Sequence, residues 1–337
     1  MNRDLAICIP SFRRPERLAE TLEAFLPQVE PHGISICVSY NDEGPGTEEV
    51  LRHFKARYPH VLWMTDPTVT GIDRNIVASV ALARSCFVWL FGDDDIPEPN
   101  AVQRVLDAVR AGEPAMVVVN GATYDSELAR VIEPARLLMS ADRFYAPGEH
   151  ARLLSDTASY TTFLGGIVVD RELWNCIDPA PFFKSDYVHV AVAYRAVIGR
   201  AAKVIAEPLI RIRLGGATWA GRYFQVELIN WPGIIWGLPP DAYLDEAKIA
   251  VCGRKPTSSL TRLLAARAYG YYGPEEYWKF VFSDTEIPAW KRWALGMILA
   301  IPSTAAGCGL MLYRHLMSIT RNDGNLELTR YRLMHRG

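Results

Sequence analysis

The sequence predicts an α/β fold, in which a mostly parallel sheet is flanked by helices and followed by a helical C-terminal region. Short apolar runs of strand length alternate with segments of helical period through the first hundred residues, and such alternation is typical of a parallel sheet covered by helices on both faces. From about Gln225 the pattern becomes helical and rich in Trp and Tyr. At ~150 residues per domain, the 337 residues predict two domains, or one large domain with an appendage. We place the two parts at 1–220 and 221–337.

Each predicted element follows from a local pattern. The strands of the first hundred residues are four apolar runs at 5–9, 34–39, 61–64 and 87–91. The helices between them begin near Pro15, Glu48 and Ile72. One face of the first helix is lined by apolar residues at helical spacing: Leu18, Leu22, Phe25, Leu26 and Val29. Proline suits the first turn of a helix, because its missing N–H has no partner there. In the later part we expect helices at 103–109 and 187–197 and strands at 115–120, 167–169, 203–206 and 209–214.

The composition excludes several classes of protein. A formal charge of −2, from 36 Lys+Arg and 38 Asp+Glu, provides no overall field to hold a polyanion, which excludes a general nucleic-acid binder. The 9 Trp, 15 Tyr and 12 Phe exclude a disordered chain. The six cysteines form no C-x-x-C unit, which favours buried thiols in a reducing compartment over a metal site or a disulfide framework. The first apolar run is too short for a signal peptide, so we expect the cytoplasm.

An apolar segment near the C-terminus, residues 293–313, contains no charged residue and is long enough to cross a hydrocarbon core of ~30 Å. Lys291, Arg292 and Arg314 flank it, whereas Pro302 and three glycines interrupt it. Three interpretations stay open: the segment spans a membrane, lies in or re-enters its interface, or forms a buried core hairpin. The tail from 314 carries five Arg against two acids, a net +3 that suits an anionic leaflet. We expect a peripheral or monotopic protein on the cytoplasmic side of the inner membrane.

The strongest chemical signal is the triplet Asp93-Asp94-Asp95, which follows the apolar strand and Gly92. In an open parallel sheet, ligands bind beyond the carboxyl ends of the strands, where this triplet lies. Three adjacent carboxylates repel one another unless a cation neutralises them, and hard oxygen ligands suit Mg²⁺ or Mn²⁺ shared with substrate phosphates. The alternative is that the acids cap a helix beginning near Pro97, for which one acid would suffice.

Three further motifs, together with the triplet, resemble family 2 glycosyltransferases of the GT-A fold, over residues 4–215 and most densely over the first hundred. These motifs are Pro10-Ser11-Phe12-Arg13-Arg14, Asn41-Asp42 and Asp73-Arg74-Asn75. The resemblance implies that the donor nucleotide is bound by Pro10, Ser11, Arg13, Asn41, Asp42, Asp73, Arg74, Asp93 and Asp94. It also implies a divalent cation, Mg²⁺ or Mn²⁺, on Asp93 and Asp95.

A later run resembles the abequosyltransferase-like branch of this family: Ile210-Arg211-Ile212-Arg213-Leu214-Gly215-Gly216-Ala217-Thr218-Trp219. This resemblance implies sugar transfer of the lipopolysaccharide or O-antigen type, to a saccharide acceptor on a polyprenyl-diphosphate lipid. The apolar segment 293–313, found independently, agrees with such an acceptor.

The expected chemistry is a single displacement that inverts the configuration at the anomeric carbon. The leaving diphosphate needs stabilisation, which a divalent ion on Asp93 and Asp95 supplies as a Lewis acid. The acceptor hydroxyl needs a general base on the opposite side. The resemblance points to Asp186 as that base, with Ser185-Asp186 in place of the family's Glu-Asp pair. Asp186 is also suited to cap a helix beginning at Tyr187.

The candidates on the acceptor or diphosphate side are Gly165, Gly166, His189, Arg211, Arg213 and Trp219. The glycine pair permits close approach of a sugar, or marks a bulge. The two arginines lie two apart on a strand and so point the same way, which suits a diphosphate clamp or a solvated face. The histidine contacts a ligand, completes the metal site or is a buried structural residue. The tryptophan stacks on a sugar or packs in the core.

These observations lead to one functional hypothesis and two alternatives. We expect a metal-dependent, inverting glycosyltransferase that moves a sugar from a nucleotide-diphosphate donor to a lipid-linked saccharide in cell-surface polysaccharide synthesis. One alternative is a nucleotidyltransferase, which also needs paired acids on an α/β sheet. The other is a non-catalytic nucleotide-sugar-binding scaffold.

Overall fold

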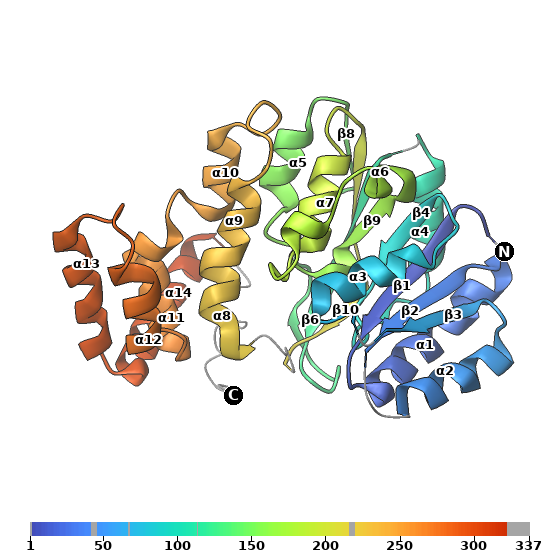
Figure 1. Cartoon of the computed structure of the whole chain (residues 1–337), viewed down its shortest axis with the longest axis horizontal. Coiled ribbons are helices and arrows are strands. Elements are labelled where there is room, and N and C mark those ends of the chain that lie inside the picture. Colours follow the sequence, from blue (N-terminus) through green and yellow to red (C-terminus); the bar gives the residue numbers. More distant parts are fainter. Residues whose placement is uncertain (1, 42–45, 67, 113, 216–219, 322–337) are drawn as a thin grey trace. The chain divides into compact units, whose positions relative to one another are not determined.

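The computed structural model describes residues 2–41, 46–66, 68–112, 114–215 and 220–321. The chain divides into two compact units (Figure 1). The sheet unit combines Met1–Leu214 with Ile234–Val251, and the helical unit combines Gly215–Gly233 with Cys252–Gly337. The domain boundary at 220 stays a prediction.

The sheet unit is built on a 10-stranded sheet with the order β3-β2-β1-β4-β9-β6-β10-β5, in which β7 also pairs with β6 and β8 with β10. The strands are β1 (Leu5–Ser11), β2 (Ser35–Tyr40), β3 (Val61–Thr65), β4 (Phe87–Leu90), β5 (Ile96–Pro97), β6 (Met116–Tyr124), β7 (Val131–Glu133), β8 (Arg143–Tyr145), β9 (Ile167–Asp170) and β10 (Ala202–Arg213). The predicted α/β fold is confirmed.

The sheet is mixed, although its first four strands are parallel as predicted. Strand β9 is antiparallel to both of its neighbours, β4 and β6. Strand β10 is parallel to β6 and antiparallel to β5. The predicted strands 203–206 and 209–214 are one strand, whose register shifts between Ile205 and Ile210. Pro208 lies in this interval, and an irregularity accommodates a residue that cannot donate to the ladder.

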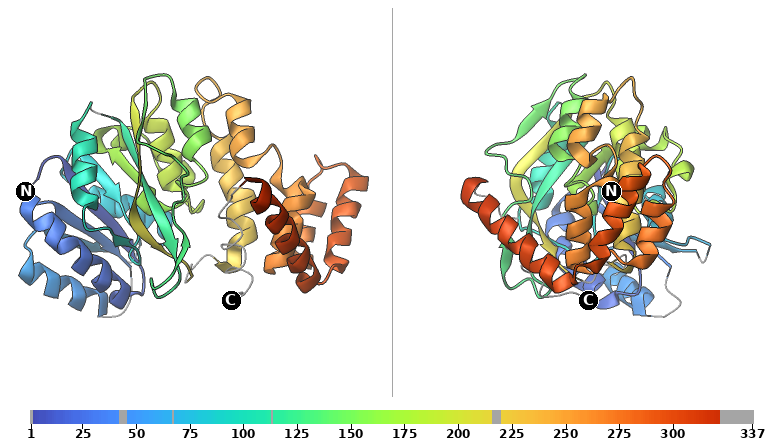
Figure 2. Two further views of the ribbon diagram at one scale, coloured as in Figure 1. Left: turned by 180° about the vertical axis from the view of Figure 1, so that it is seen from behind. Right: turned by 90° about the vertical axis from the view of Figure 1, so that its left-hand side faces the viewer.

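Helices cover both faces of this sheet (Figures 1 and 2). They are α1 (Pro15–Val29), α2 (Gly46–Arg57), α3 (Ile72–Ala81), α4 (Ala101–Arg110), α5 (His150–Thr157), α6 (Arg171–Asn175) and α7 (Val188–Ala196). The predicted apolar face of α1 is buried. From this face, Phe25 packs edge-on against Trp89 and Phe91, with ring centroids 5.8 and 4.7 Å away. This packing fixes α1 against β4 and the residues that follow it.

The predicted helical C-terminal region is present. Its elements are α8 (Tyr223–Gln225), a π-helix (Val226–Asn230), α9 (Trp231–Trp236), α10 (Asp245–Cys252), α11 (Leu260–Tyr269), α12 (Pro274–Glu276), a second π-helix (Tyr277–Phe282), α13 (Ala289–Gly296), a 3₁₀ turn (Met297–Ala300) and α14 (Ser303–Arg321). The helical unit has its own core, which includes Leu263, Tyr272, Val281 and Leu295.

The apolar segment 293–313 is divided between α13, the 3₁₀ turn and α14. Within the described part of the chain, no single helix is long and apolar enough to cross a membrane. Ala289–Ala300 and Ser303–Leu316 reach the required length and hydropathy only together, and they are bent by 101° (Figure 2). Pro302 explains the bend, because the residue before a proline avoids helical backbone angles, and Ile301 is extended.

Candidate active site

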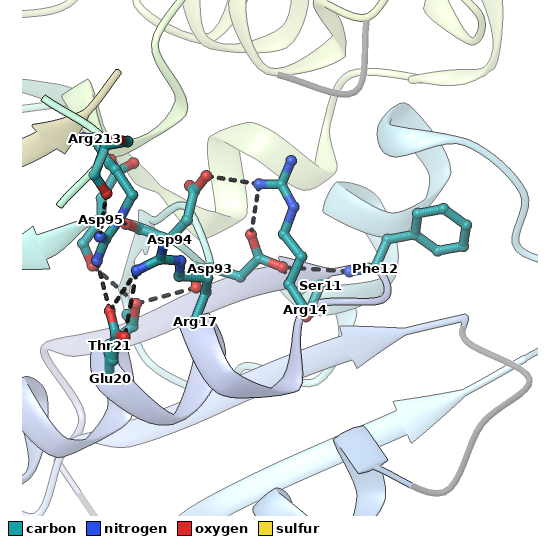
Figure 3. A network of polar contacts seen from close by, with 11 residues as sticks. Ser11, Phe12, Arg14, Arg17, Glu20, Thr21, Asp93, Asp94, Asp95 and Arg213 are labelled. Carbon is teal, nitrogen blue, oxygen red and sulfur yellow. Dashed lines mark hydrogen bonds and ion pairs between the residues drawn. The ribbon is translucent and has the colours of Figure 1, made fainter. Parts of the chain in front are cut away.

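The acidic triplet forms a turn after β4, and its first two side chains contact the end of β1 and the residues between β1 and α1 (Figure 3). Asp93 Oδ2 accepts hydrogen bonds from the Ser11 hydroxyl (2.8 Å) and the Phe12 amide (3.3 Å). Asp94 Oδ2 accepts a hydrogen bond from Arg14 Nη1 at 2.6 Å, and the same nitrogen lies 3.7 Å from Asp93 Oδ1. The first predicted donor motif and the acidic turn therefore form one polar cluster.

The third carboxylate, Asp95, is buried and is held from β10. The amide of Arg213 donates a hydrogen bond to Asp95 Oδ1 at 2.9 Å. Thr21 on α1 donates from its hydroxyl to the carbonyls of Asp93 (3.1 Å) and Asp95 (2.9 Å). A Cβ atom on Gly92 would lie 2.5 Å from Asp95 Oδ2, so a side chain at position 92 would displace this carboxylate. Hydrogen bonds from β1, α1 and β10 thus fix the turn.

The two arginines of β10 bind different carboxylates. The guanidinium of Arg213, with its side chain 6% exposed, pairs with Glu20 Oε2 at 2.6 Å and donates to the Asp94 carbonyl at 2.9 Å. Arg211 forms a two-pronged ion pair with Glu98, at 2.8 and 2.9 Å. A diphosphate clamp made from these side chains would have to draw both away from carboxylates that they already bind.

Burial changes the protonation of the acidic turn. Burial, reinforced by the charge of Asp94, raises the pKa of Asp93 to about 6. Burial also raises the pKa of Asp95 well above its usual value. Both ionised carboxylates would therefore be stabilised by a nearby cation. Within the described ranges, no group of three or more His, Cys, Asp or Glu side chains is placed to hold a metal ion. Two carboxylates still fit a Mg²⁺ or Mn²⁺ ion whose other ligands are water and substrate phosphates.

Four of the predicted donor-side residues lie at or just after the carboxyl ends of β1 and β2: Pro10, Ser11, Arg13 and Asn41. Pro10 and Ser11 are the last residues of β1. Arg13 follows with a φ of +56°, and its guanidinium lies 4.9 Å from the ring centroid of Phe12. Neighbouring parallel strands that end together form the usual ligand crevice of such sheets. The structure therefore brings these residues to the same edge as the acidic turn.

Two buried amide oxygens lie near this edge. Asn41 follows β2, and its Nδ2 donates to the Val69 carbonyl at 2.6 Å. Its Oδ1 and the Oδ1 of Asn75 are buried and accept no hydrogen bond from the residues that the structure describes. Buried polar atoms of this kind are expected to gain a partner from water or a ligand. Asp42 and Trp219, predicted to contact donor and acceptor, lie outside the described residues.

Asp73 and Arg74, at the start of α3, contact the segment that precedes α7. Asp73 is buried, and its two carboxylate oxygens accept hydrogen bonds from the amides of Asp186 and Val188, each at 3.0 Å. The guanidinium of Arg74 lies 4.5 Å from the ring centroid of Phe183. These two predicted donor residues therefore also hold the segment that carries the predicted base.

Asp186 lies just outside α7 in a left-handed conformation, with a φ of +66°. The helix begins at Val188, and its N-cap residue is Tyr187, whose amide donates to Ser185 Oγ at 2.9 Å. Asp186 is therefore one residue before the cap, and the alternative that it caps the helix is wrong. The side chain of Asp73 instead accepts the first helical amide.

His189 is a buried residue of the first turn of α7. Its Nε2 lies 3.3 Å from the Thr162 carbonyl, which can only accept, so this nitrogen carries the proton. Burial lowers the pKa of His189 to about 4, which keeps the ring neutral at neutral pH. The structure thus favours the interpretation of His189 as a buried structural residue.

This burial predicts how stability depends on pH. The unfolded chain binds a proton on His189 below its ordinary pKa of 6.5, whereas the folded protein does so only near 4. The free energy of unfolding should therefore fall as the pH drops from 6.5 towards 4, by up to about 1.4 kcal/mol per pH unit. Urea titrations of His189→Gln should show a shallower fall than those of the unmodified chain. Equal slopes for the two proteins would contradict this assignment.

The predicted glycine pair packs against aromatic rings. A Cβ atom would lie 2.7 Å from Phe163 Cζ if placed on Gly165, and 2.8 Å from Tyr160 Cε1 if placed on Gly166. The Gly165 carbonyl also accepts a hydrogen bond from Trp89 Nε1 at 2.8 Å. Internal packing therefore accounts for both glycines.

Comparison with known proteins identifies the domain that contains the acidic turn. The model of glycosyl transferase family 2 matches residues 6–164. These residues form a family 2 glycosyltransferase domain. The family and the enzyme class expected from the sequence are thereby confirmed. The glycosyltransferase domain contains the acidic turn and the donor motifs, whereas Asp186 and the arginines of β10 lie beyond the matched residues.

The expected branch of the family is also confirmed. Abequosyltransferase RfbV of Salmonella typhimurium is 26% identical over 222 residues, which are 62% of this chain and 66% of the relative. The alignment thus spans just under two thirds of that protein.

Solved structures of other proteins are similar to this chain in fold. S. aureus TarS 1–349 in complex with UDP has a TM-score of 0.58 at 11% identity, over 93% of this chain and 92% of that chain. The mannosyltransferase PcManGT of Pyrobaculum calidifontis, in complex with GDP-Man and Mn²⁺, has a TM-score of 0.53 at 14% identity, over 100% and 86%. These similarities confirm the predicted GT-A type of fold.

Three residues that support the glycosyltransferase domain's acidic turn were absent from the predicted site: Arg14, Glu20 and Thr21. A sequence signal marks one of them, Thr21. Thr21 is a polar residue between the apolar residues Leu18 and Leu22 of α1 and is fully buried, so its hydroxyl needs a partner inside the protein. Arg14 belongs to the first donor motif, but nothing local to the sequence shows that it pairs with Asp94.

Proposed function

We propose that this chain transfers a sugar from a nucleoside-diphosphate donor to a lipid-linked saccharide, with inversion and with a divalent cation, in O-antigen or related cell-surface polysaccharide synthesis. The observation that carries the proposal is the buried acidic turn at the carboxyl end of β4, inside a family 2 glycosyltransferase domain. The likeness to TarS, solved with UDP-GlcNAc, supports a nucleotide-sugar donor. The similarity to an abequosyltransferase supports a lipopolysaccharide type of acceptor.

Asp93 and Asp95 would hold the Mg²⁺ or Mn²⁺ ion, which, when bound, stabilises the leaving diphosphate as a Lewis acid. The surrounding chain keeps these carboxylates in place without reorganisation. Ser11 orients Asp93, and the amide of Arg213 orients Asp95. Arg14 offsets the charge of Asp94, the remaining acid of the turn.

Asp186 is the proposed general base, which accepts the proton of the acceptor hydroxyl as that oxygen attacks the anomeric carbon. A single displacement of the diphosphate inverts the configuration at this carbon. The support is the family resemblance together with the position of Asp186, whose segment is tied to the Asp73-Arg74 turn of the glycosyltransferase domain.

Product analysis tests the proposed reaction against its two alternatives. The purified protein is incubated with Mn²⁺, a panel of nucleotide sugars and lipid-linked saccharides, and the nucleotide products are separated. Release of the nucleoside diphosphate with a lengthened saccharide supports sugar transfer. Release of pyrophosphate would identify a nucleotidyltransferase, and donor binding without turnover on any acceptor would identify a scaffold.

We also propose that the helical unit rests on the cytoplasmic face of the membrane as a peripheral element. The exposed fractions of Trp290, Trp293 and Met297 are 72%, 62% and 69%, which does not suit a buried core hairpin. Residues 287–321 contain no Asp or Glu and four Lys or Arg, a charge that suits anionic lipid. The bend of 101° between the helices favours an interfacial or re-entrant placement over a straight span.

Vesicle binding tests this membrane proposal. The variant Trp290→Ser/Trp293→Ser should lower the partition coefficient onto anionic vesicles at least about tenfold, because each indole loses interfacial burial. The matched control is Leu260→Ser, which removes another exposed apolar side chain of the helical unit and should leave binding unchanged. Equal binding by all three proteins, or no binding by the unmodified chain, would refute the proposal.

A further inference from the structure

Asp73 accepts two hydrogen bonds from distant backbone amides, a role separate from the predicted contact with the donor nucleotide. Its side chain lies in the first turn of α3, is buried, and accepts hydrogen bonds from amides 113 and 115 positions away, those of Asp186 and Val188. A carboxylate suits this role because each of its oxygens takes one N–H. An asparagine would offer one acceptor and turn an NH₂ group towards the second amide.

The segment held by Asp73 is conformationally strained. Lys184 and Asp186 have φ angles of +72° and +66°, in the left-handed region that residues other than glycine seldom adopt. Such a conformation persists only where surrounding contacts fix it. Asp73 accepts hydrogen bonds from the amides of Asp186 and Val188, and Arg74 packs over the ring of Phe183.

The same helical turn contacts the donor side of the site. Nδ2 of Asn75 donates to the Ser11 carbonyl at 2.9 Å. The Ser11 hydroxyl in turn donates to Asp93 Oδ2 at 2.8 Å. One turn of α3 thus contacts, within three consecutive residues, both the strained segment before α7 and the strand end that binds the acidic turn.

The geometry points to Asp73 as a positioning residue, which fixes the backbone of Asp186 so that its carboxylate faces the donor held at the acidic turn. This inference rests on the proposed role of Asp186 as the base. It assigns Asp73 no direct contact with the reacting atoms. Asp73 acts through its hydrogen bonds with the amides of Asp186 and Val188. Asn75 connects the same turn of α3 to the end of β1 through its hydrogen bond to the Ser11 carbonyl.

The test combines kinetics with hydrogen exchange on the full chain. In Asp73→Asn, kcat should fall at least about 30-fold, and the donor dissociation constant measured with Mn²⁺ should change less than threefold. The amides of Asp186 and Val188 should lose protection against exchange, whereas those of β4 should keep it. Asp107→Asn, the same change at an exposed position of α4, should alter none of these quantities.

A double variant separates positioning from general destabilisation. Because Asp73 acts through Asp186, adding Asp73→Asn to Asp186→Asn should lower kcat less than threefold further. If the fall in kcat of the double variant equals the product of the two single-variant falls, the inference is wrong. An unchanged kcat or unchanged exchange protection in Asp73→Asn would also overturn it. If Asp73→Asn does not fold, Asp73→Glu, which keeps both oxygens one methylene further out, takes its place under the same criteria. The exchange result stands without any turnover, so absence of transfer by the unmodified chain would refute the proposed function and leave the contact itself measurable.

Discussion

The Asp95→Asn variant is expected to lose Mn²⁺-dependent binding of a nucleotide-sugar donor and to turn over at least about a hundredfold more slowly than the unmodified chain. A hard divalent cation needs a charged oxygen ligand at this position, and an amide oxygen is a much weaker one. The amide of Arg213, which donates to Asp95 Oδ1, still finds an acceptor in the asparagine. The turn should therefore keep its shape while losing its charge.

The stability of the metal-free Asp95→Asn variant shows whether the substitution removes only the cation site or also disrupts the fold. Burial raises the pKa of Asp95. In the metal-free protein the ionised carboxylate therefore lowers the free energy of unfolding above that pKa, whereas the protonated carboxyl group has no such effect at low pH. Asp95→Asn removes this cost, and its metal-free Tm should be equal to or above that of the unmodified chain at pH 8.

The measurement is a thermal shift with and without Mn²⁺ and donor. At a donor concentration of 100 Kd, the unmodified chain should gain about 2.7 kcal/mol, and Asp95→Asn should gain almost none. Asp107→Asn serves as control, because it removes an exposed aspartate of α4 whose side chain contacts Gln103 of the same helix. A full donor-dependent shift in Asp95→Asn would show that Asp95 does not hold the cation.

The features that sequence reasoning predicted are those encoded within a few residues. The apolar run of β4 followed by Gly92 and three aspartates specifies both a buried strand and a charged turn, and the spacing of Leu18, Leu22 and Phe25 specifies the buried face of α1. Both depend on local periodicity and on where a strand ends, and the structure confirms these elements.

The features that it missed depend on pairing between distant segments. The antiparallel insertion of β9 between β4 and β6 has no local signature, because a short apolar strand looks the same in either direction. The hydrogen bond from the Val188 amide to Asp73 joins residues 115 positions apart, and the ion pair of Arg213 with Glu20 joins residues 193 positions apart. Charged residues such as these indicate that partners exist, but the fold decides which partners they are.

The Asp186→Asn variant is expected to bind donor normally and to lose turnover by about 10²- to 10⁴-fold, the usual contribution of a general base. Asparagine is the informative replacement here, because it tolerates the φ of +66° as well as aspartate does. An alanine would add backbone strain to the loss of the carboxylate. The amide of residue 186 can still donate to Asp73, so the segment should keep its conformation.

Two measurements on Asp186→Asn decide whether Asp186 is the base. Donor affinity with Mn²⁺ should stay within threefold of the unmodified chain, because the acidic turn is unaltered, while single-turnover transfer to the acceptor should fall by the full factor. Glu172→Gln, at an exposed position of α6, controls for removal of an acid elsewhere in the sheet unit and should transfer at the normal rate. Normal transfer by Asp186→Asn would assign the proton to another acceptor. Weakened donor binding in step with the rate would make Asp186 a donor ligand, because a base that touches only the acceptor hydroxyl contributes nothing to the donor complex.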